Sequence, residues 1–194
     1  MPQLAIIAGP NGAGKSTAAP FLLPALGIDQ FVNADVIARG LSAFRPEQSA
    51  VRAGRIMLAQ LKDLAGARRD FAFETTLASR MFAPWIIELR DRGYRLTLIF
   101  LWLPSADLAV ERVSQRVAAG GHDVPEPVVR RRYTRGLRNF FSLYRPIADE
   151  WYLYDNGGYG RSRLVGCGIG AGCGMIARTP LLERIENDVA NRDS

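Results

Sequence analysis

The residues best suited to chemistry stand near the start of the chain, in the segment Gly9–Thr17 with the sequence GPNGAGKST. It fits the pattern G-x-x-x-x-G-K-[ST] and follows the apolar run 4–8. In such a turn backbone N–H groups surround a phosphate, and the following helix points the positive end of its dipole at it. We expect Lys15 to reach the β- and γ-phosphates and the Ser16 hydroxyl to ligate Mg²⁺. The pattern predicts binding of ATP or GTP with Mg²⁺ through Gly9, Asn11, Gly12, Ala13, Gly14, Lys15, Ser16 and Thr17.

Two other interpretations of this segment are weaker. A Gly-rich turn that binds nothing would not need the preceding strand, nor a lysine in a chain that has only one other, Lys62. A dinucleotide site would use Asp35, about 20 residues after the turn, to hold a ribose, but it requires G-x-G-x-x-G. Thr17 stands where the last of those glycines should be. A phosphate-binding loop is therefore favoured.

Two acids come at the ends of the next predicted strands, 30–35 and 71–76. Ligands of open α/β sheets gather beyond the carboxyl ends of the strands. Phosphoryl transfer needs a carboxylate that orients or deprotonates the acceptor hydroxyl, and Asp35 and Glu74 are candidates for that role. The alternatives are a ligand of Mg²⁺-bound water, a helix cap or a solvated strand end.

Arginines dominate the predicted helix–loop–helix at 105–145. Arg112 and Arg116 are four residues apart and share a helix face, so both are candidates for catalytic phosphate contacts. A Gly-rich break at 120–125 precedes a second arginine-rich helix. We expect this segment to form a lid over phosphates. Solvated helix faces are the alternative.

The elements that must position these groups alternate along the chain. Strands are predicted at 4–8, 30–35, 71–76, 95–103 and 150–155, with helices between them, including one from Pro46 to about Arg68 in which Pro46 fits the first turn. This alternation predicts an α/β fold with a parallel sheet, as one domain over residues 1–194. The Gly-rich segment 157–174 has no clear assignment beyond an edge strand at 163–165, and residues 180–189 are expected to form a helix.

Composition limits the classes of function. The chain has 194 residues, is 48% hydrophobic and carries a net charge of +6. No apolar run is long enough for a membrane helix and no signal peptide is evident, so we expect a cytoplasmic protein with no membrane association. Two cysteines, Cys167 and Cys173, and one histidine do not predict a zinc site. The basic charge would suit nucleic acid, but no nucleic-acid-binding module is recognisable.

An engine driven by ATP hydrolysis is also disfavoured. ABC and AAA-type ATPases place an aspartate, often followed by glutamate, at the end of a long apolar strand. Here the most apolar strand ends in the sequence LWLP, and no Ser-Gly-Gly-Gln-like signature is present.

The ordered set of motifs resembles the zeta-toxin family of P-loop kinases over about residues 3–156. The set consists of Gly9–Thr17, Asn33–Asp35, Phe73–Thr76, Gly120–Pro125 and Leu153–Asn156. The similarity is closest to the compact bacterial branch often labelled predicted ABC-type ATPase. It implies a P-loop NTPase fold with strand order 2-3-1-4-5, phosphoryl transfer from ATP/Mg²⁺, UDP-N-acetylglucosamine or a related nucleotide as acceptor, and an antitoxin protein as partner.

Carried over by position, the resemblance gives Asp35 the role of catalytic base and Arg112 that of the first phosphate-stabilising arginine. Glu74 and Thr76 would hold the sugar substrate. Two features depart from the toxin pattern. The second lid arginine falls near His122, so its role passes to Arg116 or to one of Arg130–Arg132, or is missing. The residues after Thr76 also differ, which leaves the acceptor open.

Two further interpretations remain beside the kinase. One is an ATP-binding or ATP-hydrolysing switch that acts on a protein partner. The other is a basic nucleic-acid-binding protein or polynucleotide kinase that uses arginines such as Arg131, Arg135 and Arg138.

Overall fold

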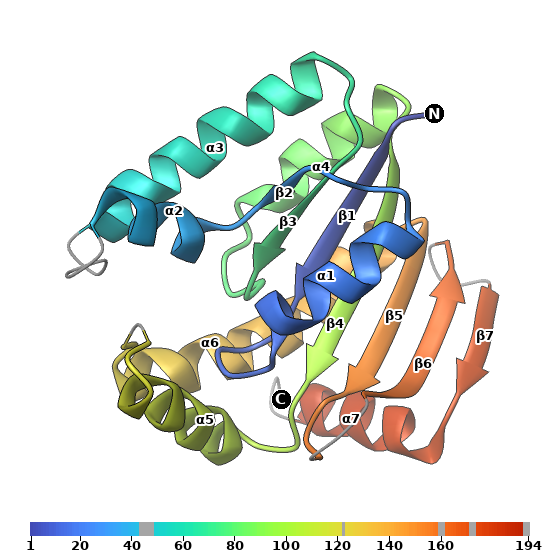
Figure 1. Cartoon of the computed structure of the whole chain (residues 1–194). Coiled ribbons are helices and arrows are strands. Elements are labelled where there is room, and N and C mark those ends of the chain that lie inside the picture. The colour runs from blue at the N-terminus through green and yellow to red at the C-terminus, as the bar shows by residue number, and fades with distance from the viewer. Residues whose placement is uncertain (43–48, 122, 159–161, 171–173, 192–194) are drawn as a thin grey trace.

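A seven-stranded sheet forms the centre of the computed structural model, which describes residues 1–42, 49–121, 123–158, 162–170 and 174–191 (Figure 1). The strands are β1 (Gln3–Ala8), β2 (Phe31–Val32), β3 (Phe71–Thr75), β4 (Arg95–Trp102), β5 (Glu150–Asp155), β6 (Arg163–Ile169) and β7 (Gly174–Arg178). The helices are α1 (Lys15–Ala25), α2 (Ala34–Leu41), α3 (Ala50–Gly66), α4 (Phe82–Asp91), α5 (Ala106–Ala118), α6 (Glu126–Asn139) and α7 (Pro180–Asn191). A π-helical turn, η2 (Phe140–Tyr144), and a 3₁₀ turn, η3 (Arg145–Ile147), follow α6.

Helices cover both faces of the sheet, which is why its central strands β1 and β4 consist almost entirely of apolar residues. Side chains alternate between faces along a strand. Leu4 and Ile6 of β1 pack with α3 and α4 on one face, whereas Ala5 and Ile7 pack with α1 on the other. A separate apolar cluster joins β4 to α5 and α6. The expected α/β P-loop fold is therefore confirmed.

The sheet order is β2-β3-β1-β4-β5-β6-β7, so the order implied by the resemblance holds for the first five strands, which are parallel. The expectation of a parallel sheet throughout is wrong beyond β5, because β6 and β7 run antiparallel. A parallel neighbour needs a crossover of about a dozen residues or more, and the link between Asp155 and Arg163 is too short for one.

Three element boundaries also differ from the prediction. Strand β2 ends at Val32, because the Asn33 side chain accepts hydrogen bonds from the backbone N–H groups of Asp35 (2.8 Å) and Val36 (3.3 Å) and so begins α2. Strand β6 continues to Ile169 and is not the edge strand expected at 163–165, because β7, which was not predicted, pairs with its other side. The expected helix start at Pro46 lies outside the described residues, as do His122 and Cys173.

None of the helices in the described part of the chain is long and apolar enough to cross a membrane.

Helix α6 lies close to the loop that follows β3. A Cβ atom at Gly136 would lie 2.2 Å from the backbone oxygen of Thr76, so any residue other than glycine would clash there. The Asn139 side chain is buried and donates a hydrogen bond to the Leu77 oxygen (2.7 Å). The arginine-rich helix is thus fixed against the loop that begins at Thr76, directly after the strand that carries Glu74.

We expect Gly136→Ala to destabilise the protein by about 1–3 kcal/mol, since the added methyl must separate α6 from the loop. Gly54→Ala is the matched control, because Gly54 is also inside a helix and a Cβ there meets no atom within 4 Å. That control should gain about 0.5–1 kcal/mol from helix propensity. Urea unfolding of both variants measures the two effects. Equal changes would show that the close approach at Gly136 is not important.

Candidate active site

The loop between β1 and α1 has the backbone conformation that its glycines allow. Gly14 precedes the first residue of α1 with φ of 78°, a left-handed conformation. Gly9 approaches β4 so closely that a Cβ would lie 2.3 Å from the Leu101 oxygen. The spacing of the motif is therefore explained by local geometry, and the loop leads directly into the N-terminus of α1.

Lys15 is only 6% exposed, although its charge would normally remain in water. Its Nζ atom donates a hydrogen bond to the Pro10 oxygen (2.9 Å) and lies 3.5 Å from Glu74 Oε1. Burial lowers the pKa of Lys15, while the negative charges of Glu74 and Asp35 oppose that shift. A buried ammonium with a lowered pKa gains stability from an additional anion, as a bound phosphate would supply.

Glu74 is the centre of the polar contacts in this site. Its Oε2 atom accepts hydrogen bonds from Ser16 Oγ (2.7 Å) and Asn33 Nδ2 (2.6 Å), in addition to the ion pair with Lys15. Strand β3 lies beside β1 with Glu74 opposite Ile7, so the carboxylate lies next to the phosphate-binding loop. The same carboxylate therefore contacts both the lysine and the hydroxyl of the motif.

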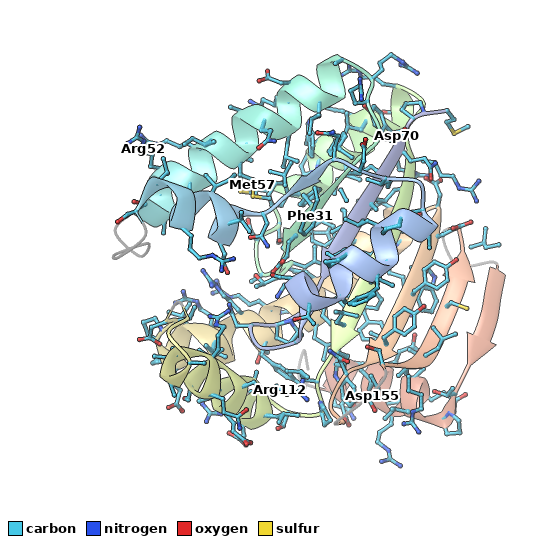
Figure 2. All side chains as sticks on the ribbon, in the orientation of Figure 1. Phe31, Arg52, Met57, Asp70, Arg112 and Asp155 are labelled. Atoms are coloured by element: carbon cyan, nitrogen blue, oxygen red, sulfur yellow. The ribbon has the colours of Figure 1, made fainter. Side chains whose placement is uncertain are left out.

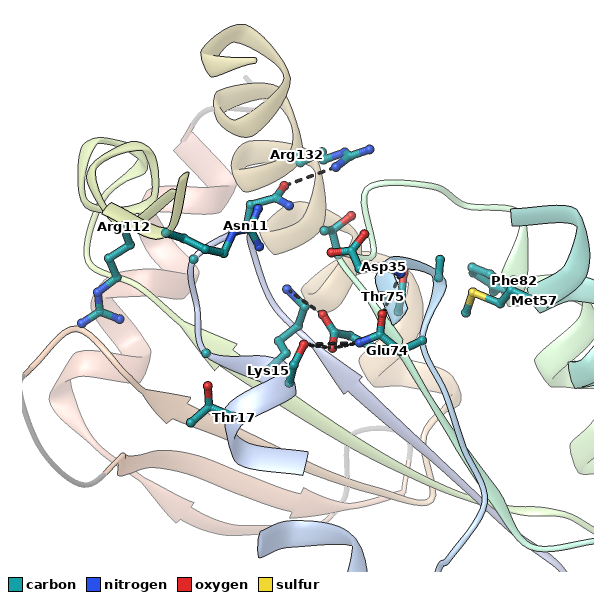
Figure 3. A pocket seen from close by; sticks show the side chains of 17 residues that line it. Asn11, Lys15, Thr17, Asp35, Met57, Glu74, Thr75, Phe82, Arg112 and Arg132 are labelled. Carbon is teal, nitrogen blue, oxygen red and sulfur yellow. Dashed lines mark hydrogen bonds and ion pairs between the residues drawn. The ribbon is translucent and has the colours of Figure 1, made fainter. Parts of the chain in front are cut away.

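A pocket of about 390 Å³ opens at this edge of the sheet and brings the predicted residues together (Figure 3). Its lining includes the predicted residues Asn11, Gly12, Gly14, Lys15, Ser16, Thr17, Asp35, Glu74, Thr76, Arg112 and Arg116. Asn33, Ala34, Met57, Thr75, Phe82 and Arg132 complete it. Gly9 and Ala13 shape the loop but do not line the pocket.

Arg112 lines this pocket, yet its guanidinium is directed elsewhere. It donates hydrogen bonds to the backbone oxygens of Asn156 (2.7 Å), Gly157 (3.1 Å) and Gly158 (3.4 Å). Figure 2 places it near the carboxyl end of β5, and in Figure 3 the guanidinium points away from Asp35. Arg112 thus ties α5 to the segment after β5. Arg116 lies close enough to Lys15 that its charge also lowers the pKa of that lysine.

Arg132 is the pocket residue that sequence reasoning did not separate from its neighbours. Its Nη1 atom donates to Asn11 Oδ1 (3.4 Å), and burial lowers its pKa against the opposing charge of Asp35. Arg130 instead pairs with Asp107 and Glu126 outside the pocket. Arg131 is exposed and Arg132 half-buried, because Arg132 flanks the helix face that Tyr133 buries. That flanking position was the available signal.

Asn33 is the second residue whose role was missed. Its side-chain oxygen caps α2, and its amide donates to Ser16 Oγ (3.3 Å) and to Glu74. An asparagine between a short strand and a helix is a typical N-cap, which was a usable signal for the cap. The contact with Glu74 depends on strand order and was not visible in the sequence.

The donors present fit Mg²⁺. The Ser16 hydroxyl and the Glu74 carboxylate are hard oxygen ligands 2.7 Å apart. Among the described residues no group of three His, Cys, Asp or Glu side chains could hold a metal ion. Two protein oxygens are enough for Mg²⁺, which usually keeps several waters and binds through one or two protein oxygens together with substrate phosphates.

Comparison with known proteins adds a family. A family model described as AAA domain matches residues 4–141. An uncharacterized protein of Haemophilus influenzae is 26% identical over 125 residues, which cover 64% of this chain and 88% of that protein.

Solved structures share the fold at low identity. A chain of the AvrRxo1-ORF1:-ORF2 complex with ATP has a TM-score of 0.73 and 17% identity, over 97% of this chain and 63% of that chain. A chain of the PezAT toxin-antitoxin system of Streptococcus pneumoniae has a TM-score of 0.64 and 12% identity, over 99% of this chain and 86% of that chain. A gluconokinase from Sinorhizobium meliloti 1021 has a TM-score of 0.53 and 17% identity, over 81% of this chain and 85% of that chain. The expected likeness to toxin and kinase P-loop folds is confirmed, and this chain spans less than two thirds of the AvrRxo1 chain.

We expect Asn33→Ala to weaken ATP binding by up to about tenfold, because Glu74 loses a hydrogen bond from the Asn33 amide. Ser105→Ala is the control. Ser105 caps α5 through the Leu108 N–H and does not line the pocket. Both variants should lose about 1 kcal/mol of stability with their caps. Calorimetric titration with ATP and Mg²⁺ separates the two, and equal affinities would contradict a role for Asn33 in the site.

Proposed function

The chain belongs to the AAA domain family, whose model spans residues 4–141, and on this premise we propose that it transfers the γ-phosphoryl group of ATP to a hydroxyl of a small molecule. The observation that carries the proposal is the composition of one pocket. It is lined by Lys15 and Ser16 of the phosphate-binding loop, by the carboxylates of Asp35 and Glu74, and by the three arginines Arg112, Arg116 and Arg132. Phosphoryl transfer requires this combination of cations and a carboxylate around one reacting phosphate.

The positive side of the pocket suits the triphosphate. Lys15 and the N-terminus of α1 would bind its β- and γ-phosphates, with GTP as the alternative nucleotide. Arg116 and Arg132 would stabilise negative charge on the transferring group. Arg112 would contribute indirectly, by holding the segment after β5 in place through its hydrogen bond to the Asn156 oxygen. Ser16 and Glu74 would hold Mg²⁺, which when bound neutralises charge on the phosphate oxygens.

Asp35 is the proposed general base. The acceptor oxygen forms a bond to the γ-phosphorus as the bond from that phosphorus to the bridging oxygen of ADP breaks, and the hydroxyl proton moves to the Asp35 carboxylate. Asp35 stands in the first turn of α2 and lines the pocket.

The acceptor contacts follow the resemblance only in part. Glu74 already binds Ser16 and Asn33, which supports a role beside the metal and the lysine more than a sugar contact. Thr76 lines the pocket and remains the proposed acceptor contact. UDP-N-acetylglucosamine or a related nucleotide is the first acceptor to test. We also propose a cytoplasmic setting and, by analogy with PezAT, an antitoxin-like protein as partner.

A lid movement of residues 105–145 is part of this proposal. Helices α5 and α6 carry Arg116 and Arg132, and Gly136 and Asn139 hold the end of α6 against the loop after β3. The proposed closure is therefore a movement of α5 and the start of α6 that would bring both arginines onto the phosphates and exclude water. Exclusion of water would suppress hydrolysis.

We expect Asp35→Asn to lower product formation by about 10²–10⁴-fold, the usual contribution of a general base, while ATP still binds. Asp107→Asn is the matched control, because Asp107 also stands in the first turn of a helix and is exposed outside the pocket. The assay follows labelled γ-phosphate from ATP to UDP-N-acetylglucosamine and then to other hydroxyl-bearing nucleotides.

One result would oppose the kinase, and another would oppose only the role of Asp35. Steady ATP hydrolysis without any acceptor product, unchanged in Asp35→Asn, would favour the switch that acts on a protein partner. A phosphorylated product made equally by Asp35→Asn and the wild type would remove Asp35 from the mechanism and leave the transfer itself established.

A further inference from the structure

The segment after β5 contacts the phosphate-binding loop through the side chain of Asn156. This residue is half-buried, and its Nδ2 atom donates a hydrogen bond to the backbone oxygen of Ala13 (2.7 Å). The amide also lies against the next residue of the loop, since a Cβ atom at Gly14 would be 2.9 Å from Asn156 Nδ2. Asn156 ends the motif 153–156, and its side chain has no role in the function proposed above.

The orientation of this amide is fixed by its other contacts. Its Oδ1 atom accepts a hydrogen bond from Ser162 Oγ (2.7 Å), so the nitrogen is the group that faces Ala13. The backbone of Asn156 is held as well. Its N–H group donates to the Trp102 oxygen (2.9 Å), and its oxygen accepts a hydrogen bond from Arg112 Nη1 (2.7 Å). A side chain held in this way can impose its geometry on the loop.

The contact determines which way one peptide unit of the loop faces. No cis peptide bond occurs in the described part of the chain, and in a planar trans peptide the C=O and N–H groups point in opposite directions. Because the Ala13 oxygen faces Asn156, the N–H group of Gly14 faces away from Asn156. Gly14 lines the pocket around Lys15 and directly precedes α1, where N–H groups have no partner within the helix.

The loop needs such support because its glycines are permissive. Gly12 and Gly14 have φ of 77° and 78°, and glycine adopts φ of either sign at little steric cost. The loop backbone alone therefore does not fix the direction of the peptide between Ala13 and Gly14. An N–H group that is already oriented binds an anion without a cost of reorganisation.

We propose that Asn156 is a positioning residue for the nucleotide: its amide holds the peptide between Ala13 and Gly14 so that the Gly14 N–H group donates to a phosphate oxygen. Arg112 supports Asn156 in this role, because it binds the Asn156 oxygen from α5. The inference rests on the proposed function for the binding of a triphosphate at this loop, but it does not depend on transfer to an acceptor.

The test compares ATP with inorganic triphosphate, each titrated calorimetrically with Mg²⁺. Asn156→Ala should weaken the binding of both about tenfold, the loss expected for one hydrogen bond to a charged group. The two losses should be equal, because the Gly14 N–H group contacts a phosphate and neither the base nor the ribose. Asn139→Ala is the matched control and should bind both ligands as the wild type does. The Asn139 amide also donates to a backbone oxygen over 2.7 Å, that of Leu77, and Asn139 does not line this pocket.

A spectroscopic measurement follows the contact itself. The amide resonance of Gly14 should shift when inorganic triphosphate saturates the wild type or Asn139→Ala, and it should shift much less in saturated Asn156→Ala. A second variant, Ser162→Ala, keeps Asn156 but removes the hydroxyl that orients its amide. Ser162 is exposed, so this variant should fold, and its affinity for triphosphate should fall about two- to threefold.

Several results would overturn the role of Asn156. These are an unchanged affinity in Asn156→Ala, an equal loss in Asn139→Ala, or a loss confined to ATP, which would indicate a contact with the base or ribose. Where Asn156→Ala does not fold, an unchanged affinity and an unchanged Gly14 resonance in Ser162→Ala would overturn it. A wild type that binds neither ligand would overturn it together with the nucleotide site.

Kinetics separates this inference from the proposed function. Where transfer occurs, Asn156→Ala should raise KM for ATP. Transfer with an unchanged KM for ATP would retain the kinase and reject the role of Asn156. Triphosphate binding that depends on Asn156, with no transfer to any acceptor, would retain this role and reject the kinase.

Discussion

A lysine buried at the edge of a sheet needs negative charge beside it, and much of this structure supplies that charge. Lys15 is 6% exposed and pairs with Glu74, which is 11% exposed. The pairing requires β3 to lie directly beside β1, because only then does Glu74 come next to the phosphate-binding loop. It also requires Asn33 to end β2, because the Asn33 amide holds the same carboxylate. Strand order, strand length and one helix cap therefore all serve a single ion pair.

The division of charge between elements follows from this arrangement. The acids come from the sheet side, with Glu74 on β3 and Asp35 at the start of α2. The arginines come from α5 and α6, which the chain brings over the same edge. Opposite charges thus reach the pocket on separate elements. In the proposed reaction the arginines would attract the phosphate, while the carboxylates would orient the acceptor.

The sequence indicated the central part of this structure well. The motif at Gly9–Thr17 has a specific spacing, and the apolar strands follow a simple alternation with helices, so the fold and the position of Lys15 and Ser16 could be predicted. Boundaries were less accessible. Asp35 was predicted at a strand end but lies in a helix, because Asn33 caps that helix. The hydrogen bond from the Asp35 N–H to the Asn33 side chain competes with extension of the strand.

Contacts between distant residues could not be predicted from spacing alone. The sequence does not distinguish the three arginines at positions 130–132. The burial of Tyr133 directs the neighbouring Arg132 into the pocket, whereas Arg130 forms an ion pair with Asp107. The antiparallel strands β6 and β7 were hidden for a different reason. Their glycine-rich sequence carries little of the alternation by which a strand is recognised.

The contacts of Arg112 have a consequence for how this sequence can vary. Its guanidinium binds three backbone oxygens, at residues 156, 157 and 158, and a backbone oxygen is present whatever the side chain. These contacts therefore require an arginine side chain at position 112, but they place no requirement on the side chains at positions 156, 157 and 158. Lysine cannot replace it, because one ammonium does not reproduce the spread of a guanidinium fork. Gly157 is restricted by a separate cause, since a Cβ there would lie 2.4 Å from Pro104. Related sequences should accordingly retain arginine at 112 and glycine at 157. Position 158 should vary, because a Cβ there meets nothing within 4 Å.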